Sequence, residues 1–394
     1  MPLLALLALA LLGAALTGCE QGPRGPQGAQ GQPSGQGVAG QGVAAPGGQQ
    51  PAAVLPQVTV QPAAPAAGPS PTLVPTAVPT AVPTATVAPT ATPHSLSIAA
   101  LRAGDYPGSE VVVEQVLPPA ASYTRQMVSY RSEGLKIQAL LLVPRGARPP
   151  SGWPVVVFNH GFIQPQQYYA TNYYVNYVDA FARNGYLVFM PDYRGHGRSE
   201  GRAAGGYGAP DYVVDVMNAL ATVRRYPEAD PQRVGMWGHS MGGYITLRAL
   251  VATDAVKAGV IWAGVVGSYP DMMFNWGNRA PPSNSPTPGP GQPGGWRNQL
   301  VREYGMPEEN PGFWASISAN TYLKDLTAPV QLHHGTADAS VPLRMSQTLE
   351  RQIREAGGAV ESLVYQGDDH NISRNLGLAL GRSVAFFDAH VKNG

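Results

Sequence analysis

One segment of this chain has the residue types needed for nucleophilic catalysis at a tight turn. Residues 238–242 are Gly-His-Ser-Met-Gly, and they lie between a predicted strand, 233–238, and a predicted helix, 241–251. Such a turn exposes the serine hydroxyl above the edge of a sheet, and its flanking residues must be small. A structural turn with an idle serine is the alternative. The strand before it and the helix after it favour Ser240 as a nucleophile.

A serine nucleophile needs a base, and the base needs a group that orients it. Asp338 closes the segment His-Gly-Thr-Ala-Asp after a predicted strand, and His370 closes Gly-Asp-Asp-His after the next one. The carboxyl ends of parallel strands meet at one edge of a sheet, so these side chains are expected to lie together. We therefore predict His370 as the base and Asp338 as its orienter.

Other acids and histidines compete for these two roles. Asp271 follows an earlier strand and is the main rival acid. Asp368 and Asp369 are expected to tighten the loop of His370. His333 and His334 end a buried strand, where histidines more often satisfy backbone groups than titrate.

An oxyanion needs two hydrogen-bond donors beside the nucleophile. We predict the backbone N–H of Met241, at the start of the helix, as the first donor. The loop after strand 155–159 contains Asn-His-Gly-Phe, and its glycine allows the N–H of Phe162 to turn toward the serine. His160 is expected to brace this loop rather than act as a base.

Four motifs together resemble those of a known superfamily. They are Asp-Tyr-Arg-Gly-His-Gly-Arg-Ser at 192–199, Gly-His-Ser-Met-Gly-Gly at 238–243, His-Gly-Thr-Ala-Asp at 334–338 and Gly-Asp-Asp-His at 367–370. In this order, they are similar to those of the α/β-hydrolase superfamily over residues 125–394. The greatest similarity is to the catalytic domain of the prolyl oligopeptidase group, with dienelactone-hydrolase-like and acetyl-xylan-esterase-like proteins nearby.

The resemblance implies a Ser240–His370–Asp338 triad and a structural, cleft-bordering role for residues 192–199. It leaves the substrate open. Prolyl oligopeptidases carry a β-propeller that restricts access to peptides, and only about 30 residues of folded sequence precede the first strand expected here. Fold-level likeness does not choose between peptide and ester.

Aromatic residues give a further indication about substrate. Five tyrosines lie within residues 168–177, and the segment 268–323 adds Trp276, Trp296 and Trp314. The spacing of Tyr169, Tyr173 and Tyr177 predicts that they share a helical face. Two interpretations stay open: packing of the segment on the sheet, or a pocket for an aromatic or sugar-linked acyl group.

Strands alternate with helices through the rest of this region, which predicts an α/β fold with a mostly parallel sheet covered on both faces. An insertion at 268–323, rich in Pro, Gly and Trp, is expected to cover the carboxyl edge of the sheet as a cap over the active site. The predicted strands are 126–131, 135–143, 155–159, 186–190, 233–238, 258–263, 330–333 and 360–365, and the predicted helices end at 184 or cover 211–225, 241–251, 343–356 and the segment before 391.

The amino-terminal region has a different composition. Residues 3–16 are almost entirely Leu and Ala, too few to span a bilayer, and Leu-Thr-Gly precedes the only cysteine, Cys19. This resembles a bacterial signal peptide, 1–18, that ends in a lipobox. The resemblance implies lipidation of Cys19 and an extracytoplasmic, membrane-anchored protein. A plain cleaved signal and a secreted protein are the alternative.

Residues 19–94 have no hydrophobic period and are rich first in Gly and Gln, then in Pro, Thr and Ala. Such a sequence cannot bury a core and predicts a disordered tether. The catalytic domain is expected to cover residues 95–394.

Charge and cysteine content exclude several classes of function. The chain has 26 Lys and Arg against 25 Asp and Glu, an even balance that predicts no nucleic-acid partner. One cysteine in 394 residues excludes an internal disulfide framework. No His, Asp or Glu cluster has metal-ligand spacing, and the chemistry of the triad needs no cofactor.

These observations predict a tethered serine hydrolase that forms an acyl-enzyme, with esters favoured over short peptides as substrates. A prolyl oligopeptidase-like peptidase is the first alternative. A non-catalytic surface-binding protein on a hydrolase scaffold is the alternative from another class.

Overall fold

The computed structural model describes residues 93–203, 206–276 and 295–394. Cys19 and the predicted signal peptide lie outside these ranges, as does the predicted tether up to residue 92. The part of the predicted insertion between 277 and 294 lies outside them too. No helix in the described ranges is long and apolar enough to cross a membrane.

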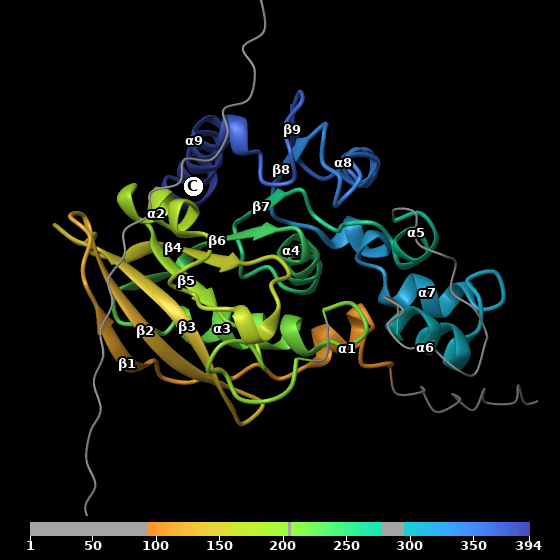
Figure 1. Cartoon of the computed structure of the whole chain (residues 1–394), viewed down its shortest axis with the longest axis horizontal. Helices are drawn as coiled ribbons and strands as arrows, with labels where there is room; N and C mark the ends of the chain where they lie inside the picture. Colours follow the sequence, from red (N-terminus) through yellow and green to blue (C-terminus); the bar gives the residue numbers. More distant parts are fainter. Residues whose placement is uncertain (1–92, 204–205, 277–294) are drawn as a thin grey trace, which may run out of the picture. The chain divides into compact units, whose positions relative to one another are not determined.

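A single mixed sheet forms the centre of the described part (Figure 1). In space its strands lie in the order β1-β2-β3-β5-β4-β6-β7-β8-β9. The pairings β1–β2, β2–β3 and β3–β5 are antiparallel, and every pairing from β5 onward to β9 is parallel. The mostly parallel sheet expected from the sequence is confirmed. The strands are β1 (Val112–Leu117), β2 (Tyr123–Ser132), β3 (Leu135–Pro144), β4 (Trp153–Asn159), β5 (Leu187–Pro191), β6 (Ala229–His239), β7 (Ala258–Trp262), β8 (Val330–Gly335) and β9 (Val360–Tyr365).

Helices cover both faces of this sheet. On one face α2 and α9 pack together, and on the other lie α1, α3, α4 and α8 (Figure 1). The helices are α1 (Ile98–Ala103), α2 (Val175–Arg183), α3 (Asp211–Val223), α4 (Met241–Ala252), α5 (Tyr269–Phe274), α6 (Gly295–Tyr304), α7 (Pro311–Ile317), α8 (Arg344–Glu355) and α9 (Leu376–Phe387), with 3₁₀ segments at Pro165–Gln167, Ala319–Asp325 and Ser373–Asn375 and a π-helical turn at Asp388–Lys392.

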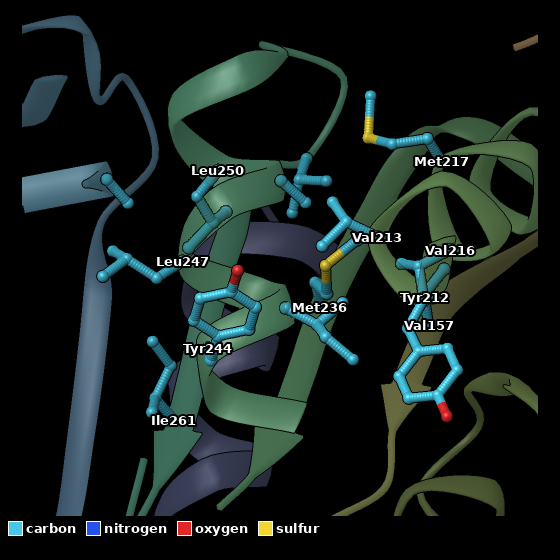
Figure 2. Close-up of a cluster of buried hydrophobic side chains, with 14 of the residues drawn as sticks. Val157, Tyr212, Val213, Val216, Met217, Met236, Tyr244, Leu247, Leu250 and Ile261 are labelled. Carbon is cyan, nitrogen blue, oxygen red and sulfur yellow. The ribbon is translucent and has the colours of Figure 1, made fainter. Parts of the chain in front are cut away.

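Alternation along the strands divides the core between the two faces. Val155 and Val157 of β4 belong to the cluster under α3 and α4, whereas Val156 and Phe158 belong to the cluster under α2 and α9. Successive side chains of a strand point to opposite faces, and parallel strands covered on both sides are apolar throughout. Figure 2 shows the first cluster, in which side chains of α3 and α4 meet Val157, Met236 and Ile261.

The strand order reverses at β4, which places a crevice beside it. β5 lies on one side of β4 and β6 on the other, and the helices that follow β4 and β6 cover opposite faces. The loops that leave the carboxyl ends of β4 and β6 therefore diverge, and ligands of open α/β sheets bind between such loops. These are the loop of Phe162 and the turn of Ser240.

Two elements near the start of the domain were not expected from the sequence. The short helix α1 is one, and its N-cap Ser97 accepts a hydrogen bond from the N–H of Ala100 at 3.0 Å. The edge strand β1 is the other. Its residues are nearly all exposed, so it lacks the alternation of apolar and polar residues that identifies a half-buried strand.

The predicted insertion contains more regular structure than its composition suggested, because α5, α6 and α7 lie within it. Trp314 and Ile317 of α7 belong to the cluster under α4. The buried guanidinium of Arg248, on α4, donates hydrogen bonds to the carbonyl oxygens of Ile317 and Leu96. The described helices of the insertion are therefore packed on the domain through both apolar and polar contacts.

Candidate active site

Ser240 is the single residue between β6 and α4. Its backbone angles are φ 55° and ψ −116°, a sparsely populated conformation that costs on the order of 1–3 kcal/mol for a residue with a side chain. A Cβ on Gly238 would collide with the carbonyl of Gly242, and a Cβ on Gly242 would collide with the carbonyl oxygen of Asn159. The two glycines of the motif are thus a steric requirement of this turn.

Backbone hydrogen bonds hold the turn in place. The N–H of Ser240 donates to the carbonyl of Trp262 at 2.9 Å, and the Ser240 carbonyl accepts from the N–H groups of Gly243 at 3.0 Å and Val265 at 3.1 Å. Because α4 begins at Met241, the N–H of Met241 lies at the positive end of a helix. Negative charge that develops beside Ser240 would be stabilised there.

His370 and Asp338 form a direct pair. The His370 Nδ1 and Asp338 Oδ2 atoms are 2.7 Å apart, and the Asp338 side chain is fully buried. Asp338 Oδ1 accepts from the N–H groups of Ser340 at 2.8 Å and Val341 at 2.9 Å, and His334 Nε2 lies 3.1 Å from Oδ2. Burial opposes ionisation, but the hydrogen bonds from His334, His370 and Val341 outweigh it and lower the pKa of Asp338.

Asp368 and Asp369 tighten the loop of His370, as the sequence predicts. The buried carboxylate of Asp368 accepts from the N–H groups of Arg374 and Asn375. Asp369 accepts from the N–H and the hydroxyl of Ser373. These hydrogen bonds lower the pKa of Asp369 and, against the effect of burial, that of Asp368. The backbone that carries His370 is thereby fixed on both sides.

The loop after β4 is braced by a histidine. The ring of His160 lies between those of Tyr168 and Tyr193, with centroids 4.3 and 4.2 Å away, and its Nδ1 is 2.7 Å from the carbonyl oxygen of Gly161. Burial, with a contribution from His196, lowers the pKa of His160 to about 3. The bracing role predicted for His160 agrees with this packing.

Ser240 and His370 line one cavity of about 440 Å³. No hydrogen bond joins the two side chains within the described residues, and among these no Asp or Glu lines the cavity. Phe162, one of the lining residues, is 60% exposed. The lining consists of Gly161, Phe162, Ile163, Tyr173, Tyr174, Tyr177, His239, Ser240, His370 and Asn371.

The chain resembles known proteins over its folded region. Residues 153–283 match the family model described as serine aminopeptidase, S33. Among solved structures, an acylaminoacyl peptidase of Pyrococcus horikoshii is 24% identical with a TM-score of 0.53, over 68% of this chain and 42% of that one. The acetyl xylan esterase of Paenibacillus sp. R4 is 19% identical with a TM-score of 0.54, over 74% of this chain and 92% of that one. The chain has the α/β-hydrolase fold.

This fold agrees with the one implied by the four motifs. Among curated relatives, the uncharacterized peptidase YuxL of Bacillus subtilis (strain 168) is 25% identical over 253 residues, which are 63% of this chain. The chain covers only 35% of the length of YuxL. The fold is therefore shared with both peptidases and an esterase.

The tyrosine cluster predicted at 168–177 is divided between two places. Tyr173 and Tyr177 line the cavity at Ser240, whereas Tyr168 and Tyr169 line a second cavity of about 370 Å³ with Asp192. The prediction that Tyr169, Tyr173 and Tyr177 share a helical face is wrong, because α2 begins only at Val175. Trp276, Trp296 and Trp314, like the other described residues of the insertion, do not line the cavity at Ser240.

The other polar residues considered in the sequence have partners of their own. The Asp271 carboxylate pairs with Arg344 at 2.9 Å. His333 Nδ1 lies 2.9 Å from the Tyr365 hydroxyl, and burial lowers the pKa of His333 to about 3. Within residues 93–203, 206–276 and 295–394, no three His, Cys, Asp or Glu side chains are grouped so that they could hold a metal ion.

Two groups beside Ser240 have no role predicted from the sequence: His239 and the hydroxyl of Tyr174. His239 is the residue immediately before the serine and is 3% exposed. Its Nδ1 is 2.7 Å from the Tyr174 hydroxyl, and its Nε2 is 3.0 Å from the carbonyl oxygen of His370. A histidine in the variable position of the motif was the available signal for His239.

Proposed function

We propose that this protein hydrolyses carboxylic esters through an acyl-enzyme on Ser240, with His370 as the base and Asp338 as its orienter. The observation that carries the proposal is the shared cavity of Ser240 and His370, together with the 2.7 Å contact between His370 Nδ1 and Asp338 Oδ2. A carboxylate so placed fixes the imidazole tautomer whose Nε2 is free to accept the serine proton.

The proposed reaction has two halves. Ser240 Oγ attacks the ester carbonyl while its proton passes to His370, and the N–H groups of Met241 and Phe162 bind the resulting oxyanion. The carbon–oxygen bond to the alcohol breaks as His370 returns the proton to the leaving oxygen. Water then attacks the acyl-enzyme, gives its proton to His370, and releases the acid as Ser240 regains its proton.

The cavity lining supports an ester rather than an aminopeptidase substrate. An enzyme that holds the charged amino terminus of a peptide needs an acid near the scissile bond. Among the described residues, the lining of this cavity contains no Asp or Glu and is mostly aromatic and aliphatic. Such a lining favours an uncharged acyl group.

A peptidase is the second candidate, and the match of residues 153–283 to the serine aminopeptidase model favours it. Hydrolysis of short acyl 4-nitrophenyl esters against peptide arylamides distinguishes the two. We expect kcat/KM for the best ester to exceed that for the best arylamide. Faster hydrolysis of the arylamides would establish the peptidase.

A fluorophosphonate probe tests the nucleophile directly. We expect it to label Ser240 in the wild-type protein, and we expect Ser240→Ala to lose labelling and to lower kcat by on the order of 10⁵- to 10⁶-fold. Ser268→Ala is a matched control, because Ser268 also starts a helix, α5, and caps it with its hydroxyl. An unlabelled wild-type protein would favour a non-catalytic binding protein.

We also propose that Cys19 carries a lipid anchor and that residues 20–94 act as a tether. Support comes from Leu-Thr-Gly before the only cysteine and from just two charged residues in the first 94. The full-length protein should enter the detergent phase, and Cys19→Ala should release it or leave it unprocessed. A chain starting at Ser95 should hydrolyse small esters at the wild-type rate, and an insoluble or inactive one would contradict the tether.

A further inference from the structure

The polar groups of Tyr174 and His239 border the cavity, yet the proposed reaction uses neither. Tyr174 has φ 58° and ψ 18°, immediately before the first residue of α2. A bulky residue is uncommon in this left-handed conformation, which persists only where surrounding contacts impose it. The Tyr174 ring packs edge-on against Phe158, with ring centroids 5.4 Å apart, and its hydroxyl has two hydrogen-bonding neighbours.

These hydrogen bonds form one continuous chain. The Gly161 N–H donates to the Tyr174 hydroxyl at 2.9 Å, the hydroxyl lies 2.7 Å from His239 Nδ1, and His239 Nε2 lies 3.0 Å from the His370 carbonyl oxygen. A backbone N–H can only donate and a carbonyl can only accept. The Gly161 N–H at one end and the His370 carbonyl at the other therefore determine the direction of the hydrogen bonds between them. The Tyr174 hydroxyl donates to His239 Nδ1, and His239 Nε2–H donates to the His370 carbonyl oxygen.

This chain of hydrogen bonds requires His239 to be neutral, since a protonated ring could not accept a hydrogen bond from the Tyr174 hydroxyl. Burial, followed by the charge that His370 would carry, lowers the pKa of His239 to about 3. The ring centroids of His239 and His370 are 4.6 Å apart. Of this adjacent pair, the buried His239 is thus held in one uncharged tautomer.

The oxyanion loop, which follows β4 and contains Gly161 and Phe162, has little room to move relative to Tyr174 and His239. A Cβ on Gly161 would lie 2.7 Å from the Tyr174 hydroxyl oxygen and 3.2 Å from both His239 Nδ1 and the Cβ of Ser240. The peptide of Gly161 adjoins that of Phe162. The Tyr174 hydroxyl therefore holds the amide next to the proposed oxyanion donor.

We propose that Tyr174 and His239 are positioning residues that tie the oxyanion loop after β4 to the loop of His370 after β9, across the turn of Ser240. The inference rests on the proposed function. The bridge aligns the N–H of Phe162 and the imidazole of His370 relative to Ser240, so its loss slows bond making and breaking more than it weakens substrate binding. Misplacement by about 1 Å is enough to cost about 100-fold in rate.

Tyr174→Phe is the direct test, because it keeps the ring against Phe158 and removes only the hydroxyl. With a small neutral ester we expect kcat to fall about 10- to 100-fold while KM stays within about twofold. Tyr123→Phe is the matched control. It removes a tyrosine hydroxyl that donates to Asp179 of α2 at 2.8 Å and does not line the cavity, and it should keep wild-type kinetics.

A double-mutant cycle tests whether Tyr174 and His239 act together through their hydrogen bond. If Tyr174 acts through His239, then Tyr174→Phe should lower kcat much less in a His239→Ala background than in the wild type. Thermal unfolding of each variant identifies any that fails to fold, and the cycle is then made with His239→Gln. Additive effects of the two changes would overturn the bridge.

Fluorophosphonate labelling separates this inference from the proposed function. Wild-type labelling of Ser240 together with wild-type kinetics for Tyr174→Phe would overturn the bridge and leave the triad standing. A rise in KM with unchanged kcat would also overturn it, because Tyr174 would then only contact substrate. An unlabelled wild-type Ser240 would overturn the proposed function and the bridge together.

Discussion

Two groupings of an aspartate with a histidine in the described part of the molecule behave in opposite ways. Asp338 follows β8 and contacts His370, while Asp192 follows β5 in the vicinity of His160. Asp338 accepts hydrogen bonds from two backbone N–H groups and from the histidine. Asp192 Oδ1 makes none within the described residues.

Their acidities differ accordingly. Burial raises the pKa of Asp192 to about 7, and its contact with Tyr168 only partly offsets this. The pKa of Asp338 is lowered despite burial. A buried carboxylate thus becomes an orienting anion only where donors are arranged around it, and this, rather than its place after a strand, distinguishes the candidate site from its surroundings.

Asp338→Asn removes the carboxylate that contacts His370, and it should have the larger effect on catalysis of the two aspartate substitutions. The amide cannot hold the imidazole in its working tautomer, so we expect kcat to fall on the order of 10⁴-fold, measured on the best ester. Asp271→Asn is the control, because it removes the rival acid and its pairing with Arg344. A comparable loss in that control would show that the acid has been assigned to the wrong residue.

The free energy of unfolding should depend on pH because three histidines are buried in the neutral state. The pKa values of His160, His239 and His333 are lowered to about 3, mainly by burial, so between about pH 3 and 6.5 the unfolded chain binds protons that the native one does not. The free energy of unfolding should therefore fall as pH drops below about 6.5. Each net proton contributes about 1.4 kcal/mol per pH unit.

Denaturant unfolding at pH 5, 6 and 7 measures this slope. Asp192 acts in the opposite sense, because its raised pKa lets the native state keep a proton that the unfolded state releases above about pH 4. The three histidines outnumber it, so the net slope should remain positive. A stability that is constant over this pH range would contradict the buried, neutral state of the histidines.

Asp192→Asn should have a much smaller effect on catalysis than Asp338→Asn. We expect kcat/KM within about threefold of wild type, against on the order of 10⁴ for Asp338→Asn. Its stability relative to wild type should increase from pH 4 to 7 and level off above pH 7, because the variant has no carboxyl group at position 192 that must ionise while buried. A loss of activity comparable to that of Asp338→Asn would remove the distinction between the two groupings.

Eight of the nine strands in the described residues and the helices that cover the sheet, other than α1, could be predicted because they follow local rules. Glycines at the turn of Ser240 and the apolar spacing of α3 and α8 are visible in the sequence. The edge strand β1 was missed because both of its faces are exposed. The contact of Tyr174 with His239 joins positions 65 residues apart, and no local pattern indicates it.

The sequence likewise predicts one part of the candidate site, the pairing of His370 with Asp338, and does not predict the arrangement of its tyrosines. The pairing of His370 with Asp338 follows from the order of strand ends along the chain. The failure at Tyr169 and Tyr173 has a physical cause, since the left-handed backbone of Tyr174 precedes α2 and keeps these residues out of the helix. Backbone conformation at a single aromatic residue cannot be read from composition or spacing.

The exposed edge of the sheet has a consequence for how the protein behaves in concentrated solution. β1 ends the strand order, and Val112, Val113 and Val116 on it are 57, 50 and 71% exposed. Free strand edges with apolar side chains favour pairing between molecules, which charged residues such as Glu114 counteract. We expect Val113→Lys to slow the growth of light scattering on storage while leaving turnover unchanged, so shelf life and catalysis can be adjusted separately.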